Sequence, residues 1–181
     1  MIYTRFSARL AALLVLAAAP VFVAHAAPAP PPGFNVHLVQ EKETARFWRG
    51  GAPKPETVEA LAKAAKARGV TVTFIDLRKP ANSDDRSGKG GRLSPAAEEA
   101  LAKKLGLRYE AINALDRALP ARLQAAQTKG DVYIHCMYGV NRTGFAVARY
   151  ARSTGAKVPD DGLGKRDWKQ GDAFQQRLDK R

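Results

Sequence analysis

Short apolar runs alternate along the chain with longer segments in which apolar residues recur every three or four positions. Residues 55–68 show the second pattern, and Gly69, a common type of helix stop, follows them. The apolar face of this segment consists of Val58, Leu61, Ala62 and Ala65. Residues 70–77 (VTVTFIDL) form a β-branched apolar run typical of a buried strand. The pattern therefore predicts a helix that leads directly into a strand.

The same alternation continues as far as Gly155. A second helix is predicted to begin at Ser94 and Pro95, because serine caps helix N-termini and proline fits the first turn, and to end at Gly106. The other predicted helices cover residues 120–129 and 142–154. The other predicted strands are an edge strand at 44–48 and two strands at 107–112 and 131–135.

Strands and helices in this order predict an α/β fold: a single domain with a mostly parallel central sheet flanked by helices. We place this domain at 44–157, because 181 residues leave room for one ordinary domain. A proline-rich linker and leader at 27–43 precede it, and a polar, basic tail at 158–181 follows, with a weak helix predicted from Asp172. Residues 78–92 are predicted to form a loop.

The first 26 residues have the three-part pattern of a secretory signal peptide. Arg5 and Arg9 precede an apolar run at 10–24, and Ala24-His25-Ala26 matches an A-x-A cleavage site. The apolar run is short for a membrane span. We therefore predict an exported protein, periplasmic or extracellular, without stable membrane insertion after cleavage. A retained N-terminal anchor is the alternative.

Charge and cysteine content narrow the classes of partner. The formal net charge of +13, or +11 without the first 26 residues, favours anionic partners. The basic residues are scattered, so nucleic acid is not the predicted partner, and nothing in the pattern indicates an oligomeric state. Cys136 is the single cysteine and is either buried apolar filler or a reactive thiol. With two histidines left after cleavage, no metal site and no other cofactor is predicted.

The segment 135–144 (HCMYGVNRTG) carries the predicted chemistry. It joins a buried strand to a helix, so loop N–H groups and the helix N-terminus can surround an anion. The planar guanidinium of Arg142 can bind two phosphoryl oxygens. These positive surroundings are expected to lower the pKa of Cys136, and Thr143 can donate a hydrogen bond to the thiolate. The predicted substrate-binding residues are Met137, Tyr138, Gly139, Val140, Asn141 and Arg142.

This segment resembles the H-C-x5-R-[ST]-G signature of the protein tyrosine phosphatase superfamily. Residues 47–53 (FWRGGAP) and 75–78 (IDLR) are similar to framework segments of its dual-specificity branch. The resemblance spans about residues 46–154 and implies a phosphatase-like fold with metal-independent cleavage of phosphate monoesters. It implies that Cys136 attacks phosphorus to form a cysteinyl-phosphate, that Arg142 and the loop amides hold the phosphoryl oxygens, and that water then releases phosphate.

The resemblance also implies supporting roles. His135 is expected to orient the loop, Arg49 and Arg78 to brace it, and Asp76 to order the strand framework. Asn141 departs from the acidic or small residue often found at this position of the family.

The resemblance further implies a general acid on the loop that follows the strand at 107–112, and Asp116 is the acidic residue there. The alternative is a surface aspartate that pairs with Arg117 or caps the helix at Pro120. Asp84 and Asp85 are more distant candidates.

The loop positions between Cys136 and Arg142 contain no lysine or arginine. Members of the resembled superfamily that act on inositol phosphates often carry basic residues inside this loop, so the resemblance favours phosphotyrosine or a small aryl or alkyl phosphate as substrate, carried by a small molecule or a protein. Inositol phosphates and phosphoinositides are the alternative substrates. Two other functional classes stay open, namely a phosphate-binding module with little catalytic activity and a basic protein that binds nucleic acid or an envelope polyanion.

Overall fold

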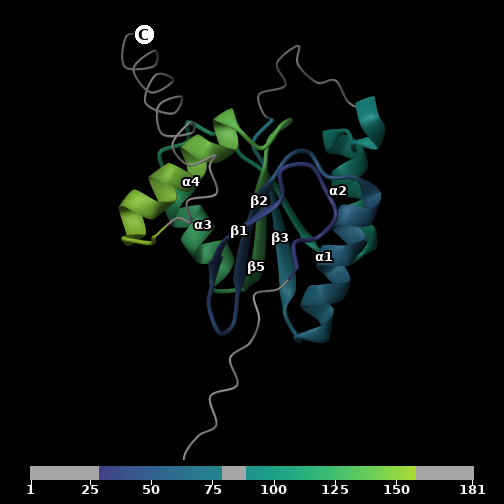
Figure 1. Ribbon diagram of the computed structural model, residues 1–181, viewed down its shortest axis with the longest axis horizontal. Coiled ribbons are helices and arrows are strands. Elements are labelled where there is room, and N and C mark those ends of the chain that lie inside the picture. Colours follow the sequence, from purple (N-terminus) through teal and green to yellow (C-terminus); the bar gives the residue numbers. More distant parts are fainter. Residues whose placement is uncertain (1–28, 79–88, 158–181) are drawn as a thin grey trace, which may run out of the picture.

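The computed structural model describes residues 29–78 and 89–157, and within them the chain forms one five-stranded sheet (Figure 1). The strand order is β1-β2-β5-β3-β4. β1 is antiparallel to β2, and all other neighbouring pairs are parallel. The strands are β1 (His37–Glu41), β2 (Arg46–Gly50), β3 (Thr71–Asp76), β4 (Arg108–Ala111) and β5 (Gly130–His135). The predicted α/β fold with a mostly parallel sheet is confirmed.

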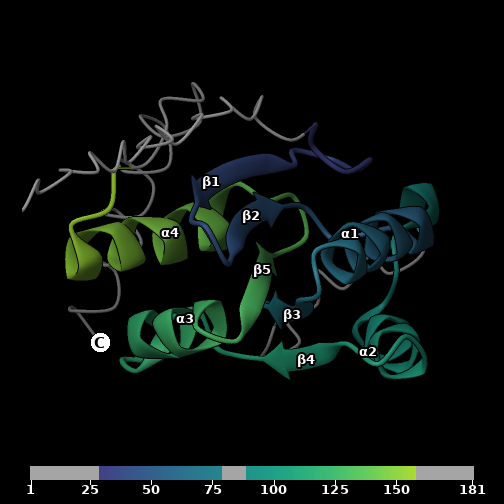
Figure 2. The same cartoon turned by 90° about the horizontal axis from the view of Figure 1, so that it is seen from below.

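Helices cover both faces of this sheet (Figure 2). α1 (Pro55–Ala67) and α2 (Pro95–Lys104) lie on one face, where α1 contacts β3 and α2 contacts β4. α3 (Leu119–Gln127) and α4 (Asn141–Thr154) lie on the other face and contact β5. A short 3-10 turn, η1 (Lys89–Gly91), precedes α2. The layers are thus those of a parallel sheet whose crossover helices bury both of its faces.

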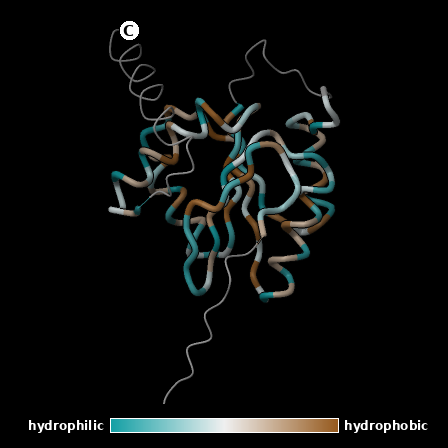
Figure 3. The backbone as a smooth tube through the Cα atoms, viewed as in Figure 1, coloured by the Kyte–Doolittle hydropathy of each residue, from teal (hydrophilic) through white to brown (hydrophobic). Residues whose placement is uncertain are grey.

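Each face of the sheet has its own apolar core, because consecutive strand residues point to opposite faces. Phe47 and Ile134 belong to the core beneath α3 and α4, whereas Trp48 and Tyr133 belong to the core beneath α1. Figure 3 shows apolar residues concentrated in the central strands and on the helix sides that face them. Full burial of one such large side chain stabilises the fold by roughly 1.5–3 kcal/mol.

Most predicted elements lie within two residues of their observed bounds, but the N-terminal edge of the sheet differs from the prediction. β1 occupies part of the predicted leader, and only Val39 of its five residues is buried, so its apolar signal is weak. β1 covers β2, so the prediction that residues 44–48 form an edge strand is wrong. β2 begins at Arg46 and is internal.

Several predictions fall on residues outside the described part of the chain. These are the signal peptide, the helix from Asp172, and the alternative acids Asp84 and Asp85. Among the helices that the structure describes, none combines the length and the hydropathy needed to cross a membrane.

The register of the sheet brings three strand ends into line. Gly50 of β2 and Asp76 of β3 both lie opposite His135 of β5. The carboxyl end of a parallel sheet is where α/β proteins place their ligands, since the loops that leave the strands gather there. Cys136 is the first residue beyond this edge.

Candidate active site

The sulfur of Cys136 lies inside a ring of backbone N–H groups. The amides of Tyr138, Gly139 and Thr143 all interact with it, and Cys136 itself is 5% exposed. These amides come from the loop after β5 and from the first turn of α4, which begins at Asn141 without a side-chain cap. Donors that no side chain caps can bind an anion.

The pKa of the Cys136 thiol is lowered below its ordinary value, although burial alone would raise it. The side chain of Thr143 and the three loop amides outweigh the effect of burial, because each stabilises the negatively charged sulfur. The Thr143 hydroxyl is buried and has no hydrogen-bond partner of ordinary geometry among the described residues. It lies close enough to the sulfur to favour the thiolate, which agrees with the role predicted for Thr143.

Gly139 holds the loop against the preceding strand end. Its φ of +72° belongs to the left-handed region, and a Cβ atom there would approach the backbone of Gly50 to 2.5 Å. Nη2 of Arg49, which is 1% exposed, donates to the Gly139 carbonyl at 2.6 Å. The prediction that Arg49 braces the loop is therefore confirmed.

Further hydrogen bonds fix the remaining predicted substrate-binding residues of the loop. The carbonyl of buried Met137 accepts from the Ala52 N–H at 3.1 Å, and the Tyr138 carbonyl accepts from Asn35 Nδ2 at 2.9 Å. Val140 accepts from the Gly144 N–H at 2.8 Å and leads into α4, where Asn141 is exposed. The loop offers amides inward while most of its carbonyls are bound by surrounding groups.

Arg142 is partly buried on the first turn of α4, and its Nη1 donates to the Leu77 carbonyl at 3.4 Å. Leu77 in turn donates its N–H to the His135 carbonyl at 2.9 Å. The guanidinium thus lies at the carboxyl end of β3, next to the strand end that precedes Cys136. Among the described residues, this one long hydrogen bond leaves most of the five N–H donors of Arg142 available for phosphoryl oxygens.

Behind the loop lies a buried charge network that joins β5, β3 and α2. His135 Nε2 contacts Glu98 Oε1 at 2.8 Å, and Arg78 Nη2 binds Glu98 at 2.6 Å and Asp76 at 2.8 Å. Tyr109 donates its hydroxyl to Asp76 at 2.8 Å. Arg78 therefore braces the loop indirectly, through Glu98 and His135.

The ionisation of this network is set by its own partners. Burial alone would lower the pKa of His135, but the carboxylates of Glu98 and Asp76 outweigh burial and raise it. Burial alone would raise the pKa of Asp76, but His135 and Arg78 outweigh burial and lower it. His135 Nδ1 lies 3.4 Å from the Cys136 carbonyl, which links the network to the loop.

Asp76, Glu98 and His135 also form the group of side chains closest to a metal-ligand set within residues 29–78 and 89–157. Arg78 already binds both carboxylates, and Glu98 binds His135. A cation at this point would have to displace a guanidinium that supplies the compensating charge. The residues therefore fit a charge network better than a metal centre.

Asp116 lies on the loop between β4 and α3, as predicted, and its carboxylate is about one-third exposed. Its Oδ1 accepts from the Ala118 N–H at 2.9 Å, and its Oδ2 lies 3.6 Å from Arg122 Nε. The carboxylate thus contacts the start of α3, and its basic neighbour is Arg122 and not Arg117. Arg149 of α4 binds the Asp116 carbonyl at 2.9 Å and ties this loop to α4.

Sequence reasoning missed two residues of the site. One is Glu98, which is fully buried. It lies four positions before Ala102 and therefore on the same, inner face of the helix, so an acidic residue on that face was the signal that could have identified it. Asn35 lies in the predicted leader and binds a residue 103 positions later, a contact for which the sequence pattern carried no signal.

No family model matches the chain, and no curated protein is similar to it in sequence. Among solved structures, the chain is similar to the "Putative phosphatase (DUF442)" of Shewanella putrefaciens, with a TM-score of 0.51 and 20% identity over 74% of this chain and 78% of that one. It is also similar to the "PTP-like phytase from Bdellovibrio bacteriovorus", with a TM-score of 0.46 and 15% identity over 82% of this chain and 79% of that one. The chain therefore has a phosphatase-like fold, the fold that its resemblance to the protein tyrosine phosphatase superfamily implies.

Proposed function

We propose that this protein is a cysteine-dependent phosphatase that hydrolyses phosphate monoesters. The observation that carries the proposal is the convergence of three backbone amides on the Cys136 sulfur, whose pKa is lowered, at the uncapped N-terminus of α4. A buried cysteine that served only as apolar filler would need no such donors, and burial would raise its pKa. The fold shared with a protein described as a phosphatase supports the same function.

In the proposed first step, the Cys136 thiolate attacks phosphorus and the bond between phosphorus and the leaving oxygen breaks. The loop amides and the Arg142 guanidinium bind the non-bridging oxygens, on which charge develops. Asp116 gives its proton to the leaving oxygen. In the second step, water attacks the cysteinyl-phosphate, the proton returns to Asp116, and inorganic phosphate leaves as the thiolate re-forms.

The proposed role of Asp116 requires its side chain to leave its present contacts. Its carboxylate binds Ala118 and Arg122 in the structure. Arg149, which anchors its loop, follows Arg142 by seven residues on α4, and a helix rises about 10 Å over that distance. We propose that a movement of the loop that carries Asp116, together with a rotation of its partly buried side chain, brings the acid toward Arg142 and the leaving group.

We propose phosphotyrosine or another small phosphate monoester as the substrate class, without a metal cofactor, in a protein exported from the cytoplasm. The proposal of export derives from the N-terminal sequence pattern. The partner is then a phosphorylated small molecule or protein met outside the cytoplasm.

The test uses hydrolysis of p-nitrophenyl phosphate by the wild type and by Cys136→Ser, Arg142→Lys and Asp116→Asn. Loss of turnover in Cys136→Ser and a large reduction in Arg142→Lys are expected, together with a phosphoenzyme trapped on Cys136 by rapid acid quench. Undiminished turnover in Cys136→Ser would contradict the proposed chemistry. An unchanged pH profile in Asp116→Asn would contradict only the assignment of the acid.

The second candidate function is a phosphate-binding module with little turnover, and the contacts of the Asp116 carboxylate with the Ala118 N–H and with Arg122 favour it. The two functions predict a different dependence of the hydrolysis rate on the leaving group. A site without a working acid cleaves p-nitrophenyl phosphate, whose leaving group needs little protonation, far better than an alkyl phosphate.

A further inference from the structure

A basic side chain lies on the outer rim of the loop, outside the segment that the signature covers. The guanidinium carbon of Arg92 is 5.0 Å from the ring centroid of Phe34 and 5.6 Å from that of Tyr138. Both aromatic residues are 47% exposed, and the Tyr138 amide interacts with the Cys136 sulfur. Arg92 therefore lies next to the same residue that lines the anion pocket.

The backbone beside Arg92 is fixed on both sides. The N–H of Leu93 donates to the Pro53 carbonyl at 2.9 Å, and Arg78 Nη1 donates to the Leu93 carbonyl at 2.8 Å. The two aromatic residues are also held by hydrogen bonds of their backbones. The Phe34 carbonyl accepts from the Gly51 N–H at 2.8 Å, and the Tyr138 carbonyl accepts from the Asn35 side chain. The rim is thus a set of residues that the fold holds in place, which lowers the ordering cost of binding a ligand.

The charge of Arg92 has no acidic partner within residues 29–78 and 89–157, and its guanidinium forms no hydrogen bond there. Stacking on Phe34 and Tyr138 occupies the flat face of the guanidinium and leaves the N–H donors in its plane available. An aromatic group of a ligand would have to displace this guanidinium from the rings. An anionic group would displace nothing.

We propose that Arg92 is a specificity-determining residue that binds a second anionic group of the substrate, such as the second phosphoryl group of a small bisphosphorylated molecule. This inference rests on the proposed function, because it assumes that the first phosphoryl group lies at Cys136. Arg92, in the segment before α2, would thus supply the positive charge that the loop positions between Cys136 and Arg142 lack.

The test compares kcat/KM for ethylene glycol bisphosphate and its longer diol homologues with kcat/KM for the corresponding monophosphates. The wild type is expected to prefer one spacer length of the bisphosphate series by about tenfold, since a hydrogen bond to a charged group contributes roughly that factor. Arg92→Gln is expected to remove this preference and to leave monophosphate turnover unchanged. A wild type without preference, or a preference that survives in Arg92→Gln, would overturn the proposal.

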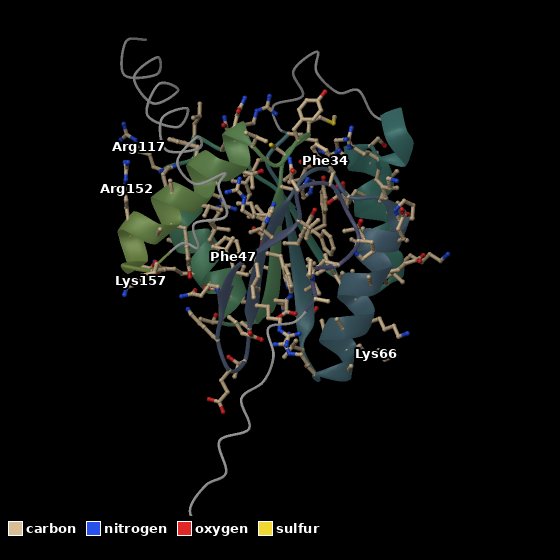
Figure 4. All side chains as sticks on the ribbon, viewed as in Figure 1. Phe34, Phe47, Lys66, Arg117, Arg152 and Lys157 are labelled. Carbon is tan, nitrogen blue, oxygen red and sulfur yellow. The ribbon has the colours of Figure 1, made fainter. Side chains whose placement is uncertain are left out.

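Lys66→Gln is the matched control, because it removes the same charge from an exposed position on α1 far from Phe34 (Figure 4). A preference lost equally in both variants would reflect net charge alone and would overturn the proposal.

Failure of the proposed function can be told apart from failure of this inference by calorimetric binding to Cys136→Ser, which needs no turnover. If Cys136→Ser/Arg92→Gln binds the bisphosphate about tenfold more weakly than Cys136→Ser does, and both variants bind the monophosphate equally, the role of Arg92 is supported even in an inactive protein. Equal affinities in the two variants would refute it.

Discussion

At the scale of single residues, the state of Cys136 depends on two opposing effects at one sulfur atom. Burial disfavours the thiolate, while the Thr143 side chain and three amides favour it, and the second group is stronger. Only proline would remove a backbone N–H, and it would also constrain the loop, whereas the Thr143 hydroxyl can be removed by a conservative substitution. This makes Thr143 the best position at which to measure how the site controls its nucleophile.

We expect Thr143→Val, which replaces the hydroxyl by a methyl group, to raise the pKa of Cys136. The midpoint of the pH dependence of alkylation by iodoacetamide should then move upward by about one pH unit. Thr73→Val is the control, since the hydroxyl of Thr73 is buried, has no hydrogen-bond partner among the described residues and is not among the groups that lower the pKa of Cys136. An identical midpoint in wild type and Thr143→Val would contradict this account of the low pKa.

Glu98 gives a second prediction at this scale. Because the folded state raises the pKa of His135, the protonated ring contributes stability that is fully present below about pH 6.5 and is lost as pH rises through the raised pKa. Glu98→Gln weakens the attraction that raises this pKa, so the decline of stability as pH rises above about 6.5 should become smaller. The variant should also lose about 3 kcal/mol at neutral pH, because a buried ionic partner is removed.

Urea denaturation of Glu98→Gln and wild type at a series of pH values measures both effects. Glu99→Gln removes an exposed carboxylate from the same helix and should change neither the slope nor the midpoint. A wild-type slope retained in Glu98→Gln would show that Glu98 does not control His135.

At the scale of elements, the site is an edge where three parallel strands end together, and the loop after β5 packs on the end of β2. Gly139 permits this contact through both its left-handed backbone and its missing side chain. These two requirements can be separated, because Gly106 has a similar φ of +70° and a Cβ atom added there would have no neighbour within 4 Å among the described residues.

We therefore expect Gly106→Ala to lose about 1 kcal/mol of stability from backbone strain alone. Gly139→Ala should lose clearly more and should also abolish phosphate binding, since the loop must move away from Gly50 and Gly51. Thermal unfolding and calorimetric titration with phosphate measure the two quantities. Equal losses of stability in both variants would refute the close approach.

The elements that the sequence predicts well are those whose pattern is decided by local burial. β5 is buried at all six positions, and the Ser94 cap binds the Ala97 N–H as its type predicts. β1 was not predicted, because one buried side chain among five residues gives no periodic signal. β1 is defined by its hydrogen bonds to β2, which are contacts of the folded sheet and not a local sequence pattern. Cys136, Arg142 and Thr143 could be selected because one contiguous segment carries them, whereas Glu98 and Asn35 reach the loop from distant elements.

At the scale of the whole molecule, the formal net charge of +13, or +11 without the first 26 residues, favours the approach of anionic molecules. Salt should therefore slow the capture of a charged substrate without altering the chemistry at sulfur. We expect kcat/KM for p-nitrophenyl phosphate to fall several-fold between low and high ionic strength. Alkylation of Cys136 by iodoacetamide, which is uncharged, should stay constant at a pH well above the thiol pKa. A parallel fall in both rates would indicate that salt perturbs the fold.

The bond between Asn35 and Tyr138 joins residues 103 positions apart and has a consequence for biosynthesis. The loop takes its final shape only after the segment before β1 has returned to meet residues made much later, and such long-range closure is slow. A nascent or unfolded chain therefore carries a cysteine of ordinary acidity, and the nucleophile matures with the last contacts of the fold. The rate at which Cys136 is labelled during refolding should thus report the completion of the protein.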